Sequence, residues 1–441
     1  MQRLLFIKLA NKLNALPAFL LVLFLSCREK DNSDRSVSSS VPVRSEISAD
    51  SLQCFPDYCQ YSSPALKDSG EAVLLIFLDP NARPELPLRM YRSLADSVPI
   101  LMMGSRRSKN GISPEEANVV VRNMLADVQA RFPHHRFQLF LAGFSGGGAL
   151  AIALSAKFPD CRGILVAAAP GNTIPAVPMI GFAGMGDPNL ADMQGRIEVA
   201  EAQNIPVCLR LWHGKHAWPD AQNMAFAFSW MKSHLAADPS YSSLYEKTLS
   251  EKSNATESSD VERKWQELDF LDRTLHLNKQ AGKSLRIHRN SDSFRKALRE
   301  AGQQQMDEVN KKAFYRQAFF EKDLVWWEAE CSRLFQEKPI PWEKQRMLGY
   351  LSLLAYSASH SALNQQDSDA AAHFIRIYRL SDPENPEAPF LEAVLQARRG
   401  NPEAAKKAMN AALALGFTDK TRILNQPEFR QAGFETIRNQ P

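Results

Sequence analysis

Short apolar runs alternate with longer amphipathic stretches between residues 72 and 235. The runs are five or six residues long, rich in Leu and β-branched side chains, and mostly bounded by Pro, Gly or Asp. Such runs are typical of strands buried on both faces of a parallel sheet, and the stretches between them have helical length and spacing. We expect strands at 73–78, 99–103, 137–142, 163–168, 179–183 and 207–212, and helices at 113–131, 147–157, 190–203 and 220–234.

This alternation predicts an α/β fold on an open, mostly parallel sheet, with a functional site beyond the carboxyl ends of the strands. The strand-like runs stop near residue 237. Residues 239–260 are polar and Ser-rich and indicate a linker, whereas residues 261–441 have helical spacing throughout. We therefore expect an α/β domain over 51–238, a linker, and an all-α domain.

The first 26 residues have the pattern of a secretory signal peptide, with a cationic start and then an apolar segment. The segment ends at Ser26-Cys27, which resembles a bacterial lipoprotein box, so we expect acylation of Cys27 and a flexible tether over 27–50. An ordinary signal peptide, or an N-terminal anchor with a chance cysteine, is the alternative. The pattern thus predicts an exported, membrane-anchored lipoprotein, periplasmic or on the surface of a bacterium, which contacts the membrane through its lipid anchor only.

Composition narrows the class of protein further. The chain has 441 residues, of which 44% are hydrophobic and 23% charged, and this excludes a disordered, collagenous or multi-span membrane chain. Three of the +4 formal charges lie in the expected signal peptide, so we expect no nucleic-acid partner. Cys54 and Cys59 could close a small loop, whereas Cys161 and Cys208 lie in or beside apolar runs and are expected to be buried thiols. No cysteine stands in an arrangement for metal binding, and we expect neither a metal nor another cofactor.

The segment 143–147, Gly-Phe-Ser-Gly-Gly, follows an expected strand directly and opens a helix of small residues. This is the G-x-S-x-G nucleophile elbow in its strand–turn–helix context. Such a turn holds the serine at positive φ, so the positions two residues away on each side must be glycine. We expect the Ser145 hydroxyl to stand above the sheet and the Gly146 N–H, at a helix N-terminus, to face an oxyanion. The alternative is a glycine-rich turn that only permits close helix packing.

An acid and a histidine follow later strands in the order that a Ser-Asp-His triad requires. Asp187 comes shortly after the fifth expected strand and His216 after the sixth, so both lie at carboxyl ends, where side chains converge. We favour Asp187 over Asp192, which is better placed to cap a helix. We favour His216 over His213, which ends its strand and has the position of a packed or half-exposed neutral histidine.

Together these features resemble exported α/β-hydrolases of the polyhydroxybutyrate-depolymerase-like, feruloyl-esterase-like and esterase-D-like group. The resemblance covers roughly residues 54–235 and implies that Ser145 attacks an ester carbonyl, His216 takes the proton and Asp187 orients the imidazole. It further implies a backbone oxyanion donor after the first strand, and Asn81 is our candidate, with Ala82 as the alternative, since Pro80 lacks an N–H. The residues that carry the resemblance lie at 78–80, 105–111, 143–147, 186–189 and 214–219.

Small residues in the helical half resemble those between the paired helices of tetratricopeptide repeats. They include Ala393, Ala405 and Ala412, and Ala371 precedes Ala405 by 34 residues, which is the period of such repeats. The match is clearest over 353–420, and a generic helical bundle is the alternative. We expect the repeats to bind a protein partner or a second copy of the chain.

The sequence therefore predicts a serine esterase-type hydrolase that forms an acyl-enzyme with a small ester. Only about ten residues separate the strands at 163–168 and 179–183, which leaves no room for a large lid and favours small or solvent-exposed acyl groups. Two alternatives stay open. One is a non-catalytic surface scaffold that binds a protein through its repeats, and the other is a serine peptidase, because the same triad cleaves amides.

Overall fold

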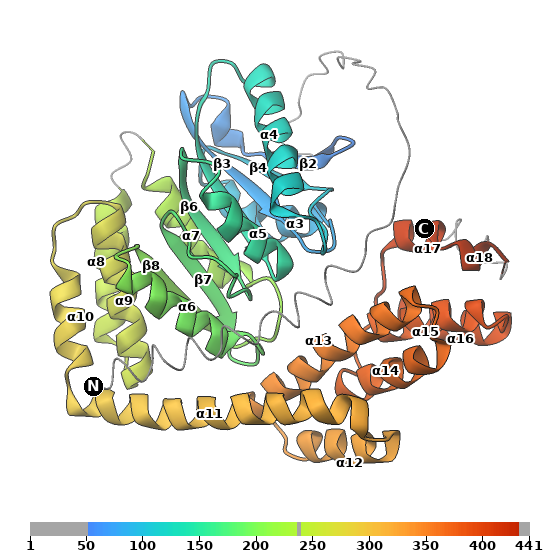
Figure 1. The fold of residues 1–441 in the computed structure, drawn as a ribbon. Coiled ribbons are helices and arrows are strands. Elements are labelled where there is room, and N and C mark those ends of the chain that lie inside the picture. The colour runs from blue at the N-terminus through green and yellow to red at the C-terminus, as the bar shows by residue number, and fades with distance from the viewer. Residues whose placement is uncertain (1–51, 236–239, 432–441) are drawn as a thin grey trace. The chain divides into compact units, whose positions relative to one another are not determined.

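The computed structural model describes residues 52–235 and 240–431, so the expected signal peptide, Cys27 and the tether lie outside the described residues (Figure 1). The chain divides into two compact units between residues 306 and 307, within helix α11 (Asp292–Glu321). The first unit contains β1 (Gln53–Cys54), β2 (Tyr58–Ser62), η1 (Pro64–Leu66), β3 (Glu71–Leu78), α3 (Glu85–Ala95), β4 (Ile100–Ser105), α4 (Pro114–Arg131), β5 (Arg136–Phe144), α5 (Gly146–Ser155), β6 (Cys161–Ala167), β7 (Met179–Gly184), α6 (Leu190–Ala202), β8 (Val207–Trp212), α7 (Ala221–Lys232), α8 (Ser240–Ser253), α9 (Ser258–Thr274) and α10 (Ala281–Arg289). The second unit contains α12 (Leu324–Phe335), α13 (Trp342–Asn364), α14 (Ser368–Ser381), α15 (Glu387–Arg398), α16 (Pro402–Ala414), α17 (Lys420–Asn425) and α18 (Pro427–Gln431).

Eight strands form one sheet in the order β1-β2-β4-β3-β5-β6-β7-β8. The pairs from β4 through β8 are all parallel, whereas β2 runs antiparallel to both β1 and β4. Parallel strands end at one edge of a sheet, so the residues that follow β5, β7 and β8 meet there. The expected fold class is confirmed: an open, mostly parallel sheet of the α/β-hydrolase type, followed by a helical region.

Helices cover both faces of the sheet (Figure 1). Successive side chains of β3 point to opposite faces of the sheet. Leu75 and Phe77 pack in the cluster that contains residues of α3 and α7, whereas Leu74 and Ile76 pack in the cluster that contains residues of α4, α5 and α6. Each of these four side chains is at most 2% exposed. This double burial is the physical reason why the strands are continuous apolar runs in the sequence.

The segment expected to be a linker is largely helical and belongs to the first unit. Leu244 and Tyr245 of α8 and Phe270 of α9 pack in the same core cluster as Trp230 of α7. The first unit therefore continues to residue 306, beyond the expected boundary at 238. The apolar positions of α8 are interspersed with Ser and charged residues, which hides its buried face in the sequence.

The cysteines occupy two kinds of environment. Cys54 and Cys59 are directly opposed in the β1–β2 hairpin and form a disulfide. Cys161, Cys208 and Cys331 are buried free thiols, and burial raises the pKa of all three, to about 11 for Cys161 and about 12 for Cys331. They are therefore protonated at neutral pH, and a thiol is a poor nucleophile and metal ligand compared with a thiolate.

The connection between β6 and β7 is short and contains no helix. It consists of residues 168–178 and therefore adds no lid at this point of the carboxyl edge, as the sequence predicts. Across the two described stretches, 52–235 and 240–431, every helix is too short or too polar to cross a lipid bilayer.

The second unit is built from helices that pack in succession. Helix α13 contacts α14, α14 contacts α15, and α15 contacts α16. Ala371, Ala393, Ala405 and Ala412 are fully buried in this unit, and small side chains of this kind let neighbouring helices approach closely. The assignment of these helices to tetratricopeptide repeats stays a prediction.

A largely buried carboxylate connects α15 with α17 and α13. Glu387 accepts a hydrogen bond from Arg422 Nη1 at 2.8 Å, and His360 Nε2 lies 3.5 Å from its carboxylate. Burial alone would raise the pKa of Glu387, but the hydrogen bonds from Arg422, together with the nearby His360 side chain, outweigh it and lower the pKa to about 2. The ionised form of Glu387 therefore stabilises the packing of these helices.

We predict that Phe270→Ala lowers the free energy of unfolding of the first unit by about 3–5 kcal/mol, because it removes a fully buried ring from the core. Ile287→Ala on α10 is the matched control, since that side chain is 65% exposed and its loss should change stability by less than about 0.5 kcal/mol. Urea unfolding of the full chain measures both. Equal, small effects would show that α9 does not belong to this core.

We predict that acid weakens the second unit through Glu387. A carboxylate whose pKa is lowered on folding stabilises the fold above its unfolded pKa of about 4.3, and this stability disappears as the pH falls through about 2. Between pH 5 and pH 2, the free energy of unfolding of the wild type should therefore fall by about 3 kcal/mol more than that of Glu387→Gln, whose amide at this position does not titrate. Urea unfolding at both pH values measures the difference, and parallel losses in the two proteins would contradict the assignment.

Candidate active site

Ser145 lies in a sharp turn between β5 and α5, with φ 49° and ψ −122°. This backbone conformation is one that residues with a side chain rarely adopt. The turn is possible because its two flanking glycines lie against backbone. A Cβ on Gly143 would stand 2.1 Å from the carbonyl oxygen of Gly147, and a Cβ on Gly147 would stand 1.9 Å from that of Leu78. Glycine is therefore required on both sides of Ser145, as the sequence pattern predicts.

The structure brings Ser145, His216 and Asp187 together. His216 Nε2 lies 3.0 Å from Ser145 Oγ, and His216 Nδ1 lies 3.1 and 3.3 Å from the two carboxylate oxygens of Asp187. Asp187 is fully buried, and the His216 side chain is 17% exposed. With its proton on Nδ1, the imidazole donates to Asp187 and leaves Nε2 to accept from the Ser145 hydroxyl.

Backbone hydrogen bonds join the loop that carries Asp187 to the loop that carries His216. The Met185 N–H donates to the Trp212 carbonyl at 2.8 Å, and the Gly186 N–H donates to the Gly214 carbonyl at 2.9 Å. The Asn189 N–H also donates to the Asp187 carboxylate at 2.8 Å. The acid is thus fixed by its own loop and by the neighbouring one.

Asp192 and His213, the alternatives to Asp187 and His216, are not part of the contacts around Ser145 Oγ. Asp192 is in the first turn of α6, where a carboxylate interacts favourably with the helix N-terminus. His213 is exposed directly after β8, whereas His216, three residues further along, is the histidine in contact with Ser145 Oγ.

Aromatic rings pack beside the His216 imidazole. The Phe144 ring lies 4.9 Å from the His216 ring and 5.8 Å from that of Trp218, centroid to centroid. Trp218 is 5% exposed, and its Nε1–H donates to the Asp79 carboxylate at 3.0 Å. Asp79 therefore connects the end of β3 to the histidine loop. This role of Asp79 was not predicted, although a carboxylate at the end of an apolar strand is a usable signal in the sequence.

The other bonds of Asp79 change the expected oxyanion site. Its carboxylate accepts from Arg83 Nε at 3.0 Å and from the Asn81 N–H at 2.9 Å, while its carbonyl accepts from the Ala82 N–H at 3.0 Å. Pro80 has no N–H. The turn thus has no free backbone N–H at positions 80–82, and the expected role of Asn81 as oxyanion donor is not supported by its hydrogen bonding. The Gly146 N–H remains at the first turn of α5, where no intrahelical acceptor exists for it.

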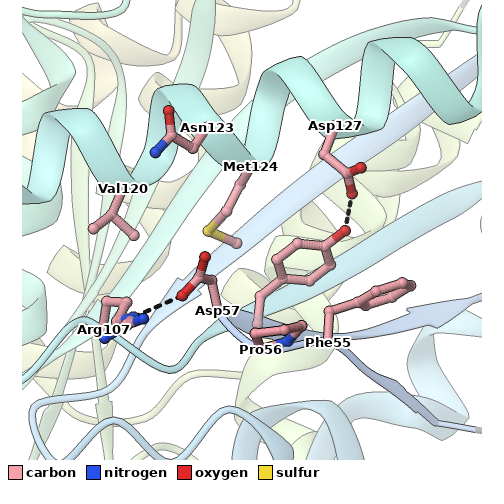
Figure 2. Close-up of a pocket in the computed structure, with 9 residues that line it drawn as sticks. Phe55, Pro56, Asp57, Arg107, Val120, Asn123, Met124 and Asp127 are labelled. Carbon is pink, nitrogen blue, oxygen red and sulfur yellow. Dashed lines mark hydrogen bonds and ion pairs between the residues drawn. The ribbon is translucent and has the colours of Figure 1, made fainter. Parts of the chain in front are cut away.

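A cavity of about 410 Å³ is lined by other residues of the first unit, and Figure 2 shows how their side chains lie. Arg107 Nε contacts the Asp57 carboxylate at 2.7 Å, and the Tyr58 hydroxyl donates to Asp127. The lining contains none of Ser145, Asp187 and His216, so this cavity is separate from the candidate active site. Its walls are the disulfide-closed hairpin, the loop after β4 and the middle of α4, through Phe55, Pro56, Asp57, Tyr58, Arg107, Val120, Asn123, Met124 and Asp127.

One group of side chains in the described part of the chain has the spacing of a metal site. Cys54, Cys59 and Glu85 place their sulfur and carboxylate atoms within 4.8 Å of one another. The two sulfurs are joined in a disulfide, however, and a disulfide lacks the thiolates that bind metals. These residues therefore do not fit a metal centre.

No protein-family model matches this sequence, and no curated protein matches it. Among solved structures, the chain is similar to FphF, a fluorophosphonate-binding serine hydrolase of Staphylococcus aureus, with 13% identity over 40% of this chain and 91% of the other and a TM-score of 0.33. The chain is also similar to TT1662 of Thermus thermophilus, with 18% identity over 43% of this chain and 99% of the other and a TM-score of 0.34. An acylaminoacyl peptidase of Pyrococcus horikoshii is 10% identical over 39% of this chain, which spans only 38% of the peptidase, with a TM-score of 0.31. Similarity this low identifies no family, so the function has to be argued from the site itself.

We predict that Gly147→Ala lowers the free energy of unfolding by about 1–3 kcal/mol, because its Cβ would collide with the backbone of β3. Gly195→Ala on α6 is the matched control. That position has open space for a Cβ, and alanine should add up to about 1 kcal/mol through helix propensity. Urea unfolding distinguishes the two, and a Gly147→Ala protein as stable as wild type would contradict the close approach of α5 to β3.

Proposed function

We propose that the chain is a serine hydrolase that cleaves carboxylic esters through an acyl-enzyme. The observation that carries this proposal is the arrangement of His216, which lies 3.0 Å from Ser145 Oγ on one side and 3.1 Å from Asp187 on the other. A hydroxyl within hydrogen-bond reach of a base that is itself oriented by a buried carboxylate has the geometry of an activated nucleophile.

In the first half of the reaction, Ser145 Oγ forms a bond to the ester carbonyl carbon and its proton moves to His216 Nε2. The π electron pair of the carbonyl moves to the oxygen, which becomes an oxyanion. This pair then reforms the carbonyl, the bond to the alkoxy oxygen breaks, and the leaving alcohol takes the proton from His216. Asp187 stabilises the imidazolium and holds its ring in place throughout.

In the second half, water attacks the acyl-enzyme by the same route. Its proton passes to His216 Nε2 as its oxygen bonds to the acyl carbon, and collapse of the intermediate returns the proton to Ser145 Oγ. The products are the carboxylic acid and free Ser145. No metal or redox cofactor takes part in these steps.

A small or solvent-exposed ester is the substrate class we propose. The β6–β7 connection of residues 168–178 contains no helix, so this part of the carboxyl edge offers little apolar surface with which to enclose a long acyl chain. The same triad attacks amides, so peptidase activity is a second outcome that a substrate panel separates from esterase activity.

We also propose that the protein works outside the cytoplasm, anchored through Cys27. The disulfide between Cys54 and Cys59 supports the location outside the cytoplasm, because disulfides persist mainly in oxidising compartments. We further propose that the second unit binds a protein partner or a second copy of the chain.

We predict that Ser145→Ala lowers kcat for p-nitrophenyl acetate by at least about 10⁴-fold and abolishes labelling by a fluorophosphonate probe, because the nucleophile is lost. Asp187→Asn should cause a comparable loss by stabilising the wrong imidazole tautomer. Ser97→Ala is the control, since this serine is exposed and its hydroxyl donates only to the Leu94 carbonyl. A wild-type protein without turnover on an ester panel and without labelling at Ser145 would refute the proposal and favour a non-catalytic scaffold.

A further inference from the structure

An oxyanion next to Ser145 requires more hydrogen-bond donors than the expected turn supplies. The Gly146 N–H at the start of α5 is one donor, but the N–H groups of Asn81 and Ala82 both donate to Asp79. Preorganised donors are commonly the largest single source of transition-state stabilisation in acyl transfer. A second donor therefore has to come from another element near Gly146.

The side chain of Asn110 lies at this position. Its Oδ1 atom stands 2.2 Å from the point that a Cβ on Gly146 would occupy, so the tip of the carboxamide lies directly against the Gly146 α-carbon. Pro80 Cβ lies 3.8 Å from the same point. The carboxamide is thus next to the residue that follows the nucleophile and beside the turn after β3, where the second donor is expected.

The loop that carries Asn110 is held firmly by the same turn. The Asn110 N–H donates to the Pro80 carbonyl at 2.7 Å, and Lys109 forms a β-bridge with Asn81. Ser108, which is 2% exposed, donates through its hydroxyl to the Asp79 carbonyl at 3.2 Å. These contacts fix the backbone of Asn110 without use of its side chain, which leaves the carboxamide free to serve a ligand.

We propose that the carboxamide of Asn110 is the second oxyanion donor of the site, an inference that rests on the proposed hydrolase function. The terminal torsion of an asparagine is soft, so a half-turn exchanges Oδ1 and Nδ2 and directs an N–H towards the space beside Gly146. Within the described part of the chain, the carboxamide has no hydrogen-bond partner that would oppose this rotation. When Ser145 Oγ bonds to the carbonyl carbon, Nδ2 and the Gly146 N–H donate to the oxygen that gains the electron pair.

A donor that acts on the oxyanion contributes in the transition state and little in the ground state. Asn110→Ala should therefore lower kcat for p-nitrophenyl acetate by roughly 10²–10³-fold with little change in KM. Asn110→Asp has the same shape, but its carboxylate accepts hydrogen bonds and repels an oxyanion at neutral pH, so its loss should equal or exceed that of the alanine variant.

Asn123→Ala is the matched control, because this asparagine is also exposed and lines the cavity that is separate from the triad (Figure 2). It should keep wild-type kcat, and all three variants should keep the wild-type unfolding midpoint. The experiment measures kcat and KM for the four proteins, together with unfolding in urea and with labelling of Ser145 by a fluorophosphonate at long incubation.

The outcomes separate the two levels of the proposal. Active wild type with unchanged kcat in Asn110→Ala refutes the donor role alone. A low kcat in Asn110→Ala with a wild-type kcat in the isosteric Asn110→Asp also refutes the donor role. The shape of the side chain, and not its hydrogen-bond donation, would then matter. Wild type without turnover or Ser145 labelling refutes the hydrolase function, and the donor role with it.

Discussion

The candidate site depends on the close packing of α5 against the sheet, which holds Ser145 at φ 49°. A non-glycine residue in this region costs of order 1–3 kcal/mol and persists only where its surroundings determine it. Here Gly143 and Gly147 lie against backbone so closely that no Cβ fits at either position. The energy of the packed core thus maintains an unfavourable turn, and that turn presents the hydroxyl to His216.

Ser145, Asp187 and His216 follow the ends of β5, β7 and β8, and hydrogen bonds between the loops fix their relative positions. Asp79 at the end of β3 binds Trp218 in the histidine loop, and Trp218 packs on Phe144, which directly precedes the nucleophile. The histidine loop is bonded in turn to the loop that carries Asp187. A misplacement of about 1 Å at a catalytic group can cost about 100-fold in rate. These contacts between loops therefore matter for the candidate site because they fix the positions of its side chains.

The sequence predicted an element correctly where a single physical requirement determines the residue types at its positions. Strands buried on two faces must be apolar throughout, and the elbow must have glycine at 143 and 147, so the sheet and the position of Ser145 could be predicted. The buried face of α8 could not, because Leu244 and Tyr245 stand among polar residues and acquire their environment only by packing against the core that contains Trp230. The donor role expected of Asn81 lacks support for a different reason, because its N–H donates to the Asp79 carboxylate two residues earlier, in a local turn that the sequence interpretation did not consider.

The central claim is that Ser145, and no other group, carries the acyl chain during turnover. Peptide mass spectrometry on the full chain, quenched in acid during steady-state hydrolysis of an aryl ester, tests this directly, because acid protonates the histidine base and stops deacylation. The claim predicts that the peptide that contains Ser145 gains the mass of the acyl group, and that this gain disappears when the substrate is exhausted. Steady hydrolysis with an unmodified Ser145 peptide, or with the acyl group on another residue, would contradict it.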